Sequence, residues 1–176
     1  GSATESGTQA VTITINEDET APVVNLSVGS NSITENSGSS ITVTATMNFA
    51  TIIDTDITIS TSGTALEGTD YGNVADITIS AGDTTGTATF TPTDDSVYEG
   101  NETATITMAS VTGANAGSTT SQTITITENE STPVVTLATS ASSIAENAGS
   151  SLTLTATLSV ATTADVTGGI STSGTG

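Results

Sequence analysis

Residues 93–103 carry four carboxylates and no basic side chain. The segment reads TDDSVYEGNET and holds Asp94, Asp95, Glu99 and Glu102. The whole chain of 176 residues has 19 acidic residues and no Lys, Arg or His, so its formal net charge is −19. Such a cluster persists in a folded protein if its members are spread apart in water, if some of them are protonated, or if a cation sits among them.

The side chains that are present favour one class of ion. Ca²⁺ takes about six to eight oxygen ligands in irregular geometry, which suits loops that supply several carboxylates. Mg²⁺ keeps several waters and a strict octahedron, and Zn²⁺ usually takes imidazole or thiolate ligands. The chain contains no His and no Cys. If an ion occupies the cluster, we therefore expect Ca²⁺.

The uniform negative charge excludes several classes of partner. Nucleic acid is not an expected partner, because phosphate binding rests on Lys and Arg. Attraction to anionic lipid is excluded for the same reason, and no apolar run approaches the roughly 18 residues that a membrane span requires. We therefore expect no direct membrane insertion.

Catalysis lacks its usual residues as well. Without His, Cys or Lys, only Ser, Thr, Tyr and carboxylates remain. Paired acids could hydrolyse a glycoside, but a sugar cleft is usually lined with aromatic side chains, and the chain has only two Tyr and two Phe. We predict that the protein is not an enzyme.

An internal repeat organises the chain. The segment TITINEDETAPVV (12–24) recurs as TITITENESTPVV (123–135), and SITENSGSSITVTATM (32–47) recurs as SIAENAGSSLTLTATL (143–158). The offset is constant and needs no gap, since Pro22 recurs as Pro133 and 133 − 22 = 111.

The repeat predicts three units of unequal extent. Residues 1–20 are the C-terminal strand segment of a preceding repeat, residues 21–131 form one complete repeat, and residues 132–176 are the N-terminal part of a following repeat. Each flanking unit lacks most of its partner strands, and an open sheet edge invites pairing with other chains.

Apolar residues alternate with Thr throughout the complete repeat, which is typical of half-buried strands. Thr is about a quarter of the chain, far above ordinary usage, and its β-branched side chain suits a pleated surface. We predict seven strands, near 22–30, 40–48, 56–61, 76–80, 86–92, 103–110 and 121–128. Seven short antiparallel strands in about 110 residues predict an all-β, Ig-like sandwich.

The Thr rows allow two further interpretations. Regular Thr ladders can bind ice, and dense Thr can carry O-glycans. The plainer interpretation is that Thr forms strands on a solvated face. A twisted sandwich face does not favour a match to an ice lattice.

Strand direction places most of the acid at one end of this sandwich. Antiparallel strands alternate in direction, so the first, third and fifth inter-strand loops share an end with the exit from the last strand. Glu35 lies in the first of these loops and Asp70 in the third. The segment 93–103 lies in the fifth, and Glu128 and Glu130 follow the last strand.

Five segments resemble the Calx-beta domain, which is known from sodium–calcium exchangers, integrin β4 and large bacterial surface proteins. They are ITENSG (33–38), GTALEGTDY (63–71), ITISAGDTTGTATF (77–90), DDSVYEGNET (94–103) and TITITENE (123–130). The segments span nearly the whole repeat in the order and spacing of the family. The resemblance implies a Calx-beta-type sandwich that is one of the tandem repeats of a large bacterial-type surface or adhesin protein.

The resemblance also implies a ligand set. Calcium-binding members of the family take their ligands from these same loops. Carried over, the candidate metal ligands are Glu35, Asp70, Asp94, Asp95, Glu99, Glu102, Glu128 and Glu130. Ser96 replaces a third consecutive Asp of the exchanger type, and Glu128-Asn129-Glu130 replaces an Asp run. Both departures lower the available charge and imply fewer or weaker ions.

The functional expectation follows from the position of these acids just before Pro133, where one repeat passes into the next. We expect a calcium-binding repeat that acts as a structural stalk or adhesive module of an extracellular or cell-surface protein, with Ca²⁺ stiffening the junctions. Its expected partners are neighbouring repeats of the same chain and a cell-surface or matrix ligand. The alternative is a subunit of an extracellular fibre or surface layer that self-associates by strand exchange and needs no metal.

Overall fold

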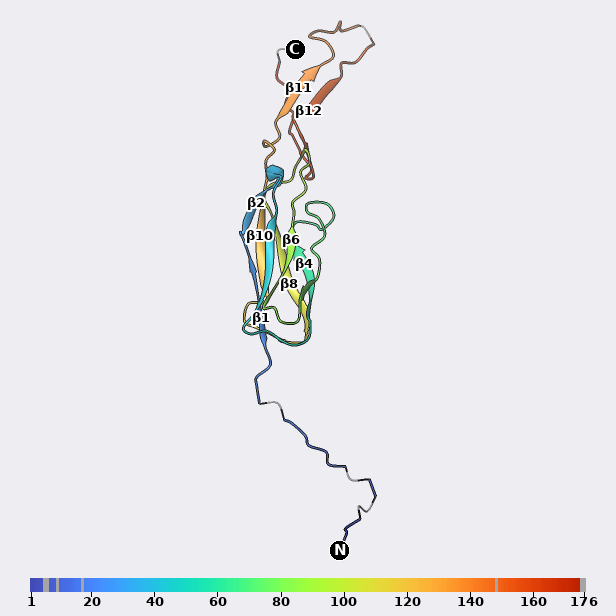
Figure 1. Ribbon diagram of the computed structural model, residues 1–176. Coiled ribbons are helices and arrows are strands. Elements are labelled where there is room, and N and C mark those ends of the chain that lie inside the picture. The colour runs from blue at the N-terminus through green and yellow to red at the C-terminus, as the bar shows by residue number, and fades with distance from the viewer. Residues whose placement is uncertain (5–6, 9, 17, 148, 175–176) are drawn as a thin grey trace.

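The computed structural model describes residues 1–4, 7–8, 10–16, 18–147 and 149–174. Figure 1 shows a β-sandwich with an extended N-terminal segment leaving one end and the C-terminal segment leaving the opposite end. In the described part of the chain, no helix has the length and apolar character needed to cross a membrane.

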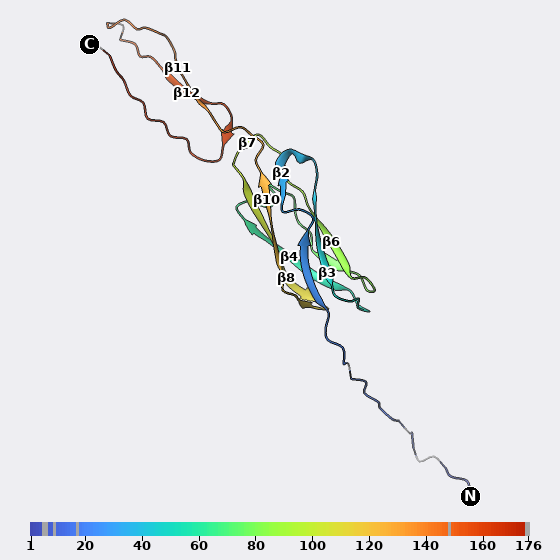
Figure 2. The ribbon, with the colours of Figure 1, turned by 90° about the vertical axis from the view of Figure 1, so that its left-hand side faces the viewer.

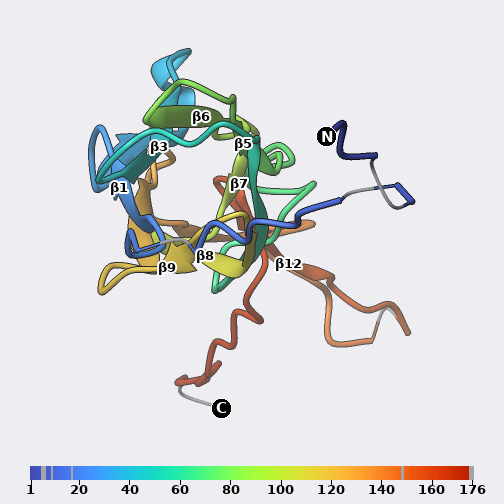
Figure 3. The same cartoon turned by 60° about the horizontal axis from the view of Figure 1, so that its bottom comes forward.

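Two sheets form the sandwich, and Figure 3 shows them as facing layers around the core. The first sheet has the order β6-β3-β1-β9. Its strands are β6 (Thr85–Phe90), β3 (Ile41–Met47), β1 (Val23–Val28) and β9 (Asn115–Ala116). The second sheet has the order β2-β10-β8-β4-β5. Its strands are β2 (Ser32–Thr34), β10 (Ser121–Thr127), β8 (Glu102–Thr112), β4 (Thr55–Gly63) and β5 (Ile77–Ile79). The expected all-β sandwich is confirmed.

The first predicted strand, near 22–30, is β1, and the chain then changes sheet to form β2. β1 pairs antiparallel with β3, whereas β2 pairs parallel with β10 in the other sheet. The chain changes sheet around Gly29, whose N–H donates to the Thr42 carbonyl at 2.9 Å. Thr125 N–H donates to the Asn31 carbonyl at 2.9 Å and starts the new pairing. The sandwich is therefore not purely antiparallel, and β2 covers the edge of β10.

The core sits between the layers and is built mainly from small aliphatic side chains, as the composition predicts. In β3, alternate residues Ile41, Val43, Ala45 and Met47 are buried. Tyr71 and Phe90 add the aromatic contribution, with ring centroids 4.7 Å apart. The period-two pattern thus points the apolar residues of each strand inward and most of its Thr residues outward.

The following segment begins to fold like the complete repeat. β11 (Val135–Thr139) pairs antiparallel with β12 (Leu154–Leu158), and Val135 lies opposite Leu158. In the complete repeat Val24 lies opposite Met47, so the register is the same after a shift of 135 − 24 = 158 − 47 = 111. A short strand, β13 (Ala161–Thr162), then pairs with β7 (Val97–Tyr98) of the complete repeat.

Candidate metal centre

Two groups of carboxylates lie at the end of the sandwich from which the chain passes into the following segment. We call Glu35, Glu128 and Glu130 the junction triad, and Asp70, Glu99 and Glu102 the loop triad. Within each triad, one carboxylate oxygen from each residue lies within 4.8 Å of the others. Six of the eight predicted ligands therefore come together from four separate parts of the chain.

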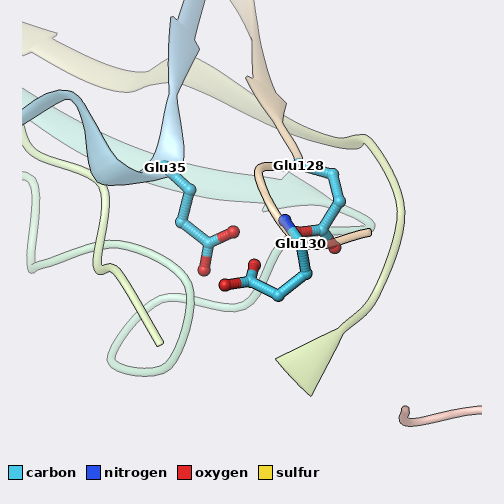
Figure 4. Close-up of side chains that lie close together, drawn as sticks. All are labelled: Glu35, Glu128 and Glu130. Carbon is cyan, nitrogen blue, oxygen red and sulfur yellow. The ribbon is translucent and has the colours of Figure 1, made fainter. Parts of the chain in front are cut away.

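The parallel pairing of β2 with β10 builds the junction triad. Thr34 lies opposite Thr127, and each strand ends there. The next residue of each segment is a glutamate, so Glu35 and Glu128 lie side by side. Glu35 also begins a short 3₁₀ turn, Glu35–Ser37. Figure 4 shows the carboxylates of the triad directed toward one another.

Glu128 is held by four backbone N–H groups. Its Oε2 accepts hydrogen bonds from Glu99 N–H at 2.6 Å and Gly100 N–H at 2.9 Å. Its Oε1 accepts from Asn129 N–H and Glu130 N–H, both at 2.9 Å. Burial by itself would raise the pKa of Glu128, but these bonds outweigh it and lower the pKa to about 2. Glu128 is therefore a fixed negative charge that ties the segment after β10 to the loop between β6 and β8.

Glu35 and Glu130 are in the opposite electrostatic situation. Glu35 is 9% exposed, and burial together with the charges of Glu128, Asp95 and Glu130 raises its pKa to about 7. A side-chain hydrogen bond with Glu128, followed by burial, raises the pKa of Glu130. The Oε2 atom of Glu130 is buried and has no hydrogen-bond partner. A buried acceptor without a donor, surrounded by carboxylates, can be satisfied by a proton or by a cation.

The loop triad joins two loops to the start of β8. Asp70 is 9% exposed, and its Oδ2 accepts a hydrogen bond from Leu66 N–H at 2.6 Å. Burial, followed by a hydrogen bond with Asp70, raises the pKa of Glu102 to about 7. Burial, followed by the charge of Asp70, also raises the pKa of Glu99. Two of the three carboxyl groups thus hold protons more tightly than isolated glutamates do.

The two triads influence each other. The charge of Glu128 raises the pKa of Glu99, and the charge of Glu35 raises the pKa of Glu102. No basic side chain exists anywhere in the sequence to offset this repulsion. The arrangement can therefore bind protons near neutral pH or bind hard cations through oxygen ligands. The donor set fits Ca²⁺, which accepts carboxylate, carbonyl and water oxygens together.

The other two predicted ligands, Asp94 and Asp95, lie outside the triads. Asp95 is exposed, and its Oδ1 accepts a hydrogen bond from Val97 N–H at 2.7 Å. Its charge still raises the pKa of Glu35 and of Glu99. Asp94 is exposed, and its charge contributes to the raised pKa of Glu130. Both residues border the triads without joining either one.

Asn101 helps to position Glu128, and the sequence does not reveal this role. Asn101 Oδ1 accepts a hydrogen bond from Glu128 N–H at 3.0 Å, which fixes the turn after β10 against the start of β8. Asn101 lies within the acidic segment 93–103, but an uncharged amide among carboxylates gives no signal of its own. Nearby Glu67, by contrast, accepts a hydrogen bond from Thr61 Oγ1 at 2.6 Å and belongs to neither triad.

The sandwich matches solved Calx-beta domain structures. The apo form of the Calx CBD1 domain is similar with a TM-score of 0.52 and 20% sequence identity, over 62% of this chain and 98% of that domain. CBD12 from CALX1.2 is similar with the same TM-score and identity, over 60% of this chain and 45% of that one. No protein-family model matches the sequence, and no curated protein matches it. The expected Calx-beta fold is therefore confirmed by structural similarity.

Proposed function

We propose that the complete repeat binds Ca²⁺ through the junction and loop triads and acts as one bead of a tandem-repeat stalk or adhesive module of an extracellular surface protein. The observation that carries this proposal is the unpartnered, buried Oε2 of Glu130 in a triad of carboxylates. A chain without basic residues offers this atom no cationic side chain. The proposed role includes no catalytic step.

Each triad supplies three carboxylates, which leaves room for carbonyl and water oxygens in a calcium shell of about six to eight ligands. Glu128 is already ionised and oriented by four backbone N–H groups, so it needs no rearrangement to face a cation. Glu35 and Glu102, whose pKa values are about 7, would lose their bound protons when the ion enters. A bound ion would also offset the repulsion that, after burial, raises their pKa values.

Calcium binding would act on the junction between repeats. Glu128 and Glu130 lie in the segment that leads to Pro133, and Glu35 belongs to the body of the sandwich. An ion shared by these residues would fix that segment to the sandwich and restrict rotation of one repeat relative to the next. A ligand that binds only the folded state also stabilises it by RT ln(1 + L/Kd), where L is the free ion concentration. We expect a Kd of about 10⁻⁴ to 10⁻³ M, as in other extracellular calcium modules.

A second candidate function, assembly into fibres by strand exchange, rests on the exposed apolar residues of the flanking segments. Ile13 and Ile15 are 81% and 91% exposed, whereas Ile124 and Ile126, which lie 111 positions later, are buried in β10. An exposed apolar segment can add as a strand to an open sheet of another copy. Sedimentation at increasing protein concentration separates the two functions, because a stalk stays a discrete rod and a strand-exchanged fibre grows.

Calorimetric titration of calcium into the metal-free chain tests the calcium proposal. We expect saturable binding that weakens by at least about ten-fold in Glu130→Gln, because the neutral amide offers the ion less charge. Glu67→Gln is the matched control, since Glu67 lies outside the triads, and its calcium affinity should equal that of the wild-type chain. Absence of saturable binding to the wild-type chain would overturn the proposal.

A further inference from the structure

The loop between β3 and β4, residues 48–54, carries an exposed apolar surface. Phe49 is 38% exposed, Ile52 is 96% exposed and Ile53 is 59% exposed. The loop lies at the end of the sandwich opposite the triads, beside the point where the N-terminal segment joins β1. Asn48 marks this position, because its Oδ1 accepts a hydrogen bond from Val23 N–H at 2.8 Å.

The following segment repeats the same local geometry. Val23 and Asn48 are joined by a second hydrogen bond, from Asn48 N–H to the Val23 carbonyl at 3.3 Å. After the shift of 111 residues, Ser159 Oγ accepts from Val134 N–H at 2.9 Å, and Ser159 N–H donates to the Val134 carbonyl at 3.0 Å. The β3–β4 loop and its counterpart in the following segment therefore begin in the same way.

In the following segment, this counterpart loop contacts the complete repeat. Ala161–Thr162 form β13 and pair in parallel with Val97–Tyr98, which form β7 in the loop between β6 and β8. Figure 2 shows β7 beside the segment that follows β12. Val160 and Thr162 are half-buried there. Residues 161–162 correspond to residues 50–51, and the two residue types, Ala and Thr, are the same in both copies.

We propose that the β3–β4 loop of the complete repeat is the docking surface for the preceding repeat of the same polypeptide. Residues 50–51 would pair with the strand of that repeat that corresponds to β7, and Phe49, whose counterpart Val160 is half-buried in the observed contact, would be covered. The proposal rests on the tandem arrangement proposed above but does not require calcium. Its support is the pairing of β13 with β7, which shows the same loop in contact one repeat later.

The contact lies next to the triads on the other partner. Val97–Tyr98 lie between Asp95, which borders the triads, and Glu99, which belongs to the loop triad. The docked loop therefore contacts the segment that supplies carboxylates to the candidate metal centre. Backbone pairing places the two repeats in register, and burial of the large apolar side chain of Phe49 favours the docked state.

Disulfide trapping in an extended chain tests the docking surface. The extended chain consists of residues 21–131 followed directly by a second copy of residues 21–131. This arrangement preserves the spacing of the natural repeat boundary. Cys replaces Val97 in the first copy and Ala50 in the second copy. The natural sequence has no Cys, so no other disulfide competes. Thr87→Cys in the second copy replaces Ala50→Cys in the control, since Thr87 is exposed on β6, away from the loop.

We expect the Val97–Ala50 cysteine pair to form a disulfide at least roughly ten-fold faster than the control pair, because docking raises the effective concentration of the two thiols. Adding Phe49→Ser in the second copy should reduce this advantage. Phe49 is 38% exposed and lies outside the core, so the single-repeat chain carrying this change should unfold at nearly the same temperature as wild type. Equal disulfide rates for the two pairs would overturn the proposal.

The same measurement with calcium and with chelator separates this proposal from the calcium proposal. Faster trapping in either condition supports docking. If trapping is fast but calcium does not bind, only the calcium proposal fails. If calcium binds but trapping stays at the control rate in both conditions, the docking surface is wrong and the calcium site stands.

Discussion

A carboxylate oxygen of Glu35 lies within 4.8 Å of a carboxylate oxygen of Glu130, although 130 − 35 = 95 residues separate them in sequence. The two groups face each other in Figure 4. Like charges at this distance disfavour double ionisation, so the pair shares protons or binds a cation. The choice between these two states has measurable consequences.

Calcium binding should release protons at neutral pH. The pKa values of Glu35 and Glu102 are about 7, so each group is about half protonated at pH 7 and must lose that proton to bind an ion. We expect release of on the order of one proton at pH 7 and almost none at pH 9. Calorimetry in buffers of different ionisation enthalpy measures this number. Calcium binding without proton release at pH 7 would show that these two carboxylates are not ligands.

The metal-free protein should be more stable at pH 5 than at pH 8. Glu35 and Glu102 have folded-state pKa values of about 7, raised from 4.5, so their contribution to stability is full below 4.5 and is lost as pH rises through 7. Because both groups are partly solvated, we expect a difference of about 1–3 kcal/mol. Urea unfolding in chelator at several pH values measures it, and a stability that rises from pH 5 to pH 8 would contradict it.

Below pH 4 the trend should reverse. The pKa of Glu128 is lowered from 4.5 to about 2, so its contribution is present above 4.5 and is lost as pH falls through 2. The stability of the metal-free protein should therefore pass through a maximum between about pH 4 and 5. Extending the urea series to pH 2 locates the maximum.

Glu35→Gln and Glu128→Gln should have opposite effects on the metal-free protein at pH 8. Glu35→Gln removes a repelled, buried charge and should stabilise the fold by about 1–3 kcal/mol. Glu128→Gln replaces an oxygen that accepts two backbone N–H bonds by an amide donor and should destabilise it by about 1–3 kcal/mol. Thermal unfolding in chelator compares the two variants. Destabilisation by both would show that the hydrogen bond between Glu35 and the Asp95 backbone outweighs the repulsion.

Gly63→Ala should destabilise the fold strongly. Gly63 has φ +129°, and a Cβ there would collide with the Thr103 carbonyl, which lies next to Glu102 in β8. We expect a loss of about 3–5 kcal/mol from backbone strain and overpacking. Gly38→Ala is the control, because Gly38 has φ +61° but open space around its Cα, and it should cost only about 1–2 kcal/mol. Chemical denaturation of both variants measures the difference, and equal losses would contradict the predicted collision.

The sequence predicts at which end of the sandwich the acidic side chains lie. It does not predict that they divide into two triads. Strand parity alone places Glu35, Asp70, the segment 93–103 and the exit from the last strand together, and the structure brings them together. The pairing of β2 with β10 is what places Glu35 beside Glu128. That pairing depends on the change of sheet near Gly29, for which hydrophobic alternation gives no signal.

The sequence also could not predict that Asp95 and Glu99 make different contacts. Both are acids of one loop, but Asp95 turns back to accept from Val97 N–H, whereas Glu99 reaches the loop triad. Short acidic side chains compete for local backbone donors in this way, and the outcome depends on the path of the loop. The fold itself was predictable, because alternation of apolar residues with Thr determines which face of each strand is buried.

The most direct test of the calcium account is the melting temperature of the full chain in excess calcium compared with excess chelator at pH 7.5 and constant ionic strength. We expect calcium at about 100 times its Kd to stabilise the fold by about 2.7 kcal/mol and to raise the melting temperature by several degrees. Magnesium at the same concentration should have a smaller effect, because it retains its waters. A melting temperature that is identical in calcium and in chelator would contradict the account.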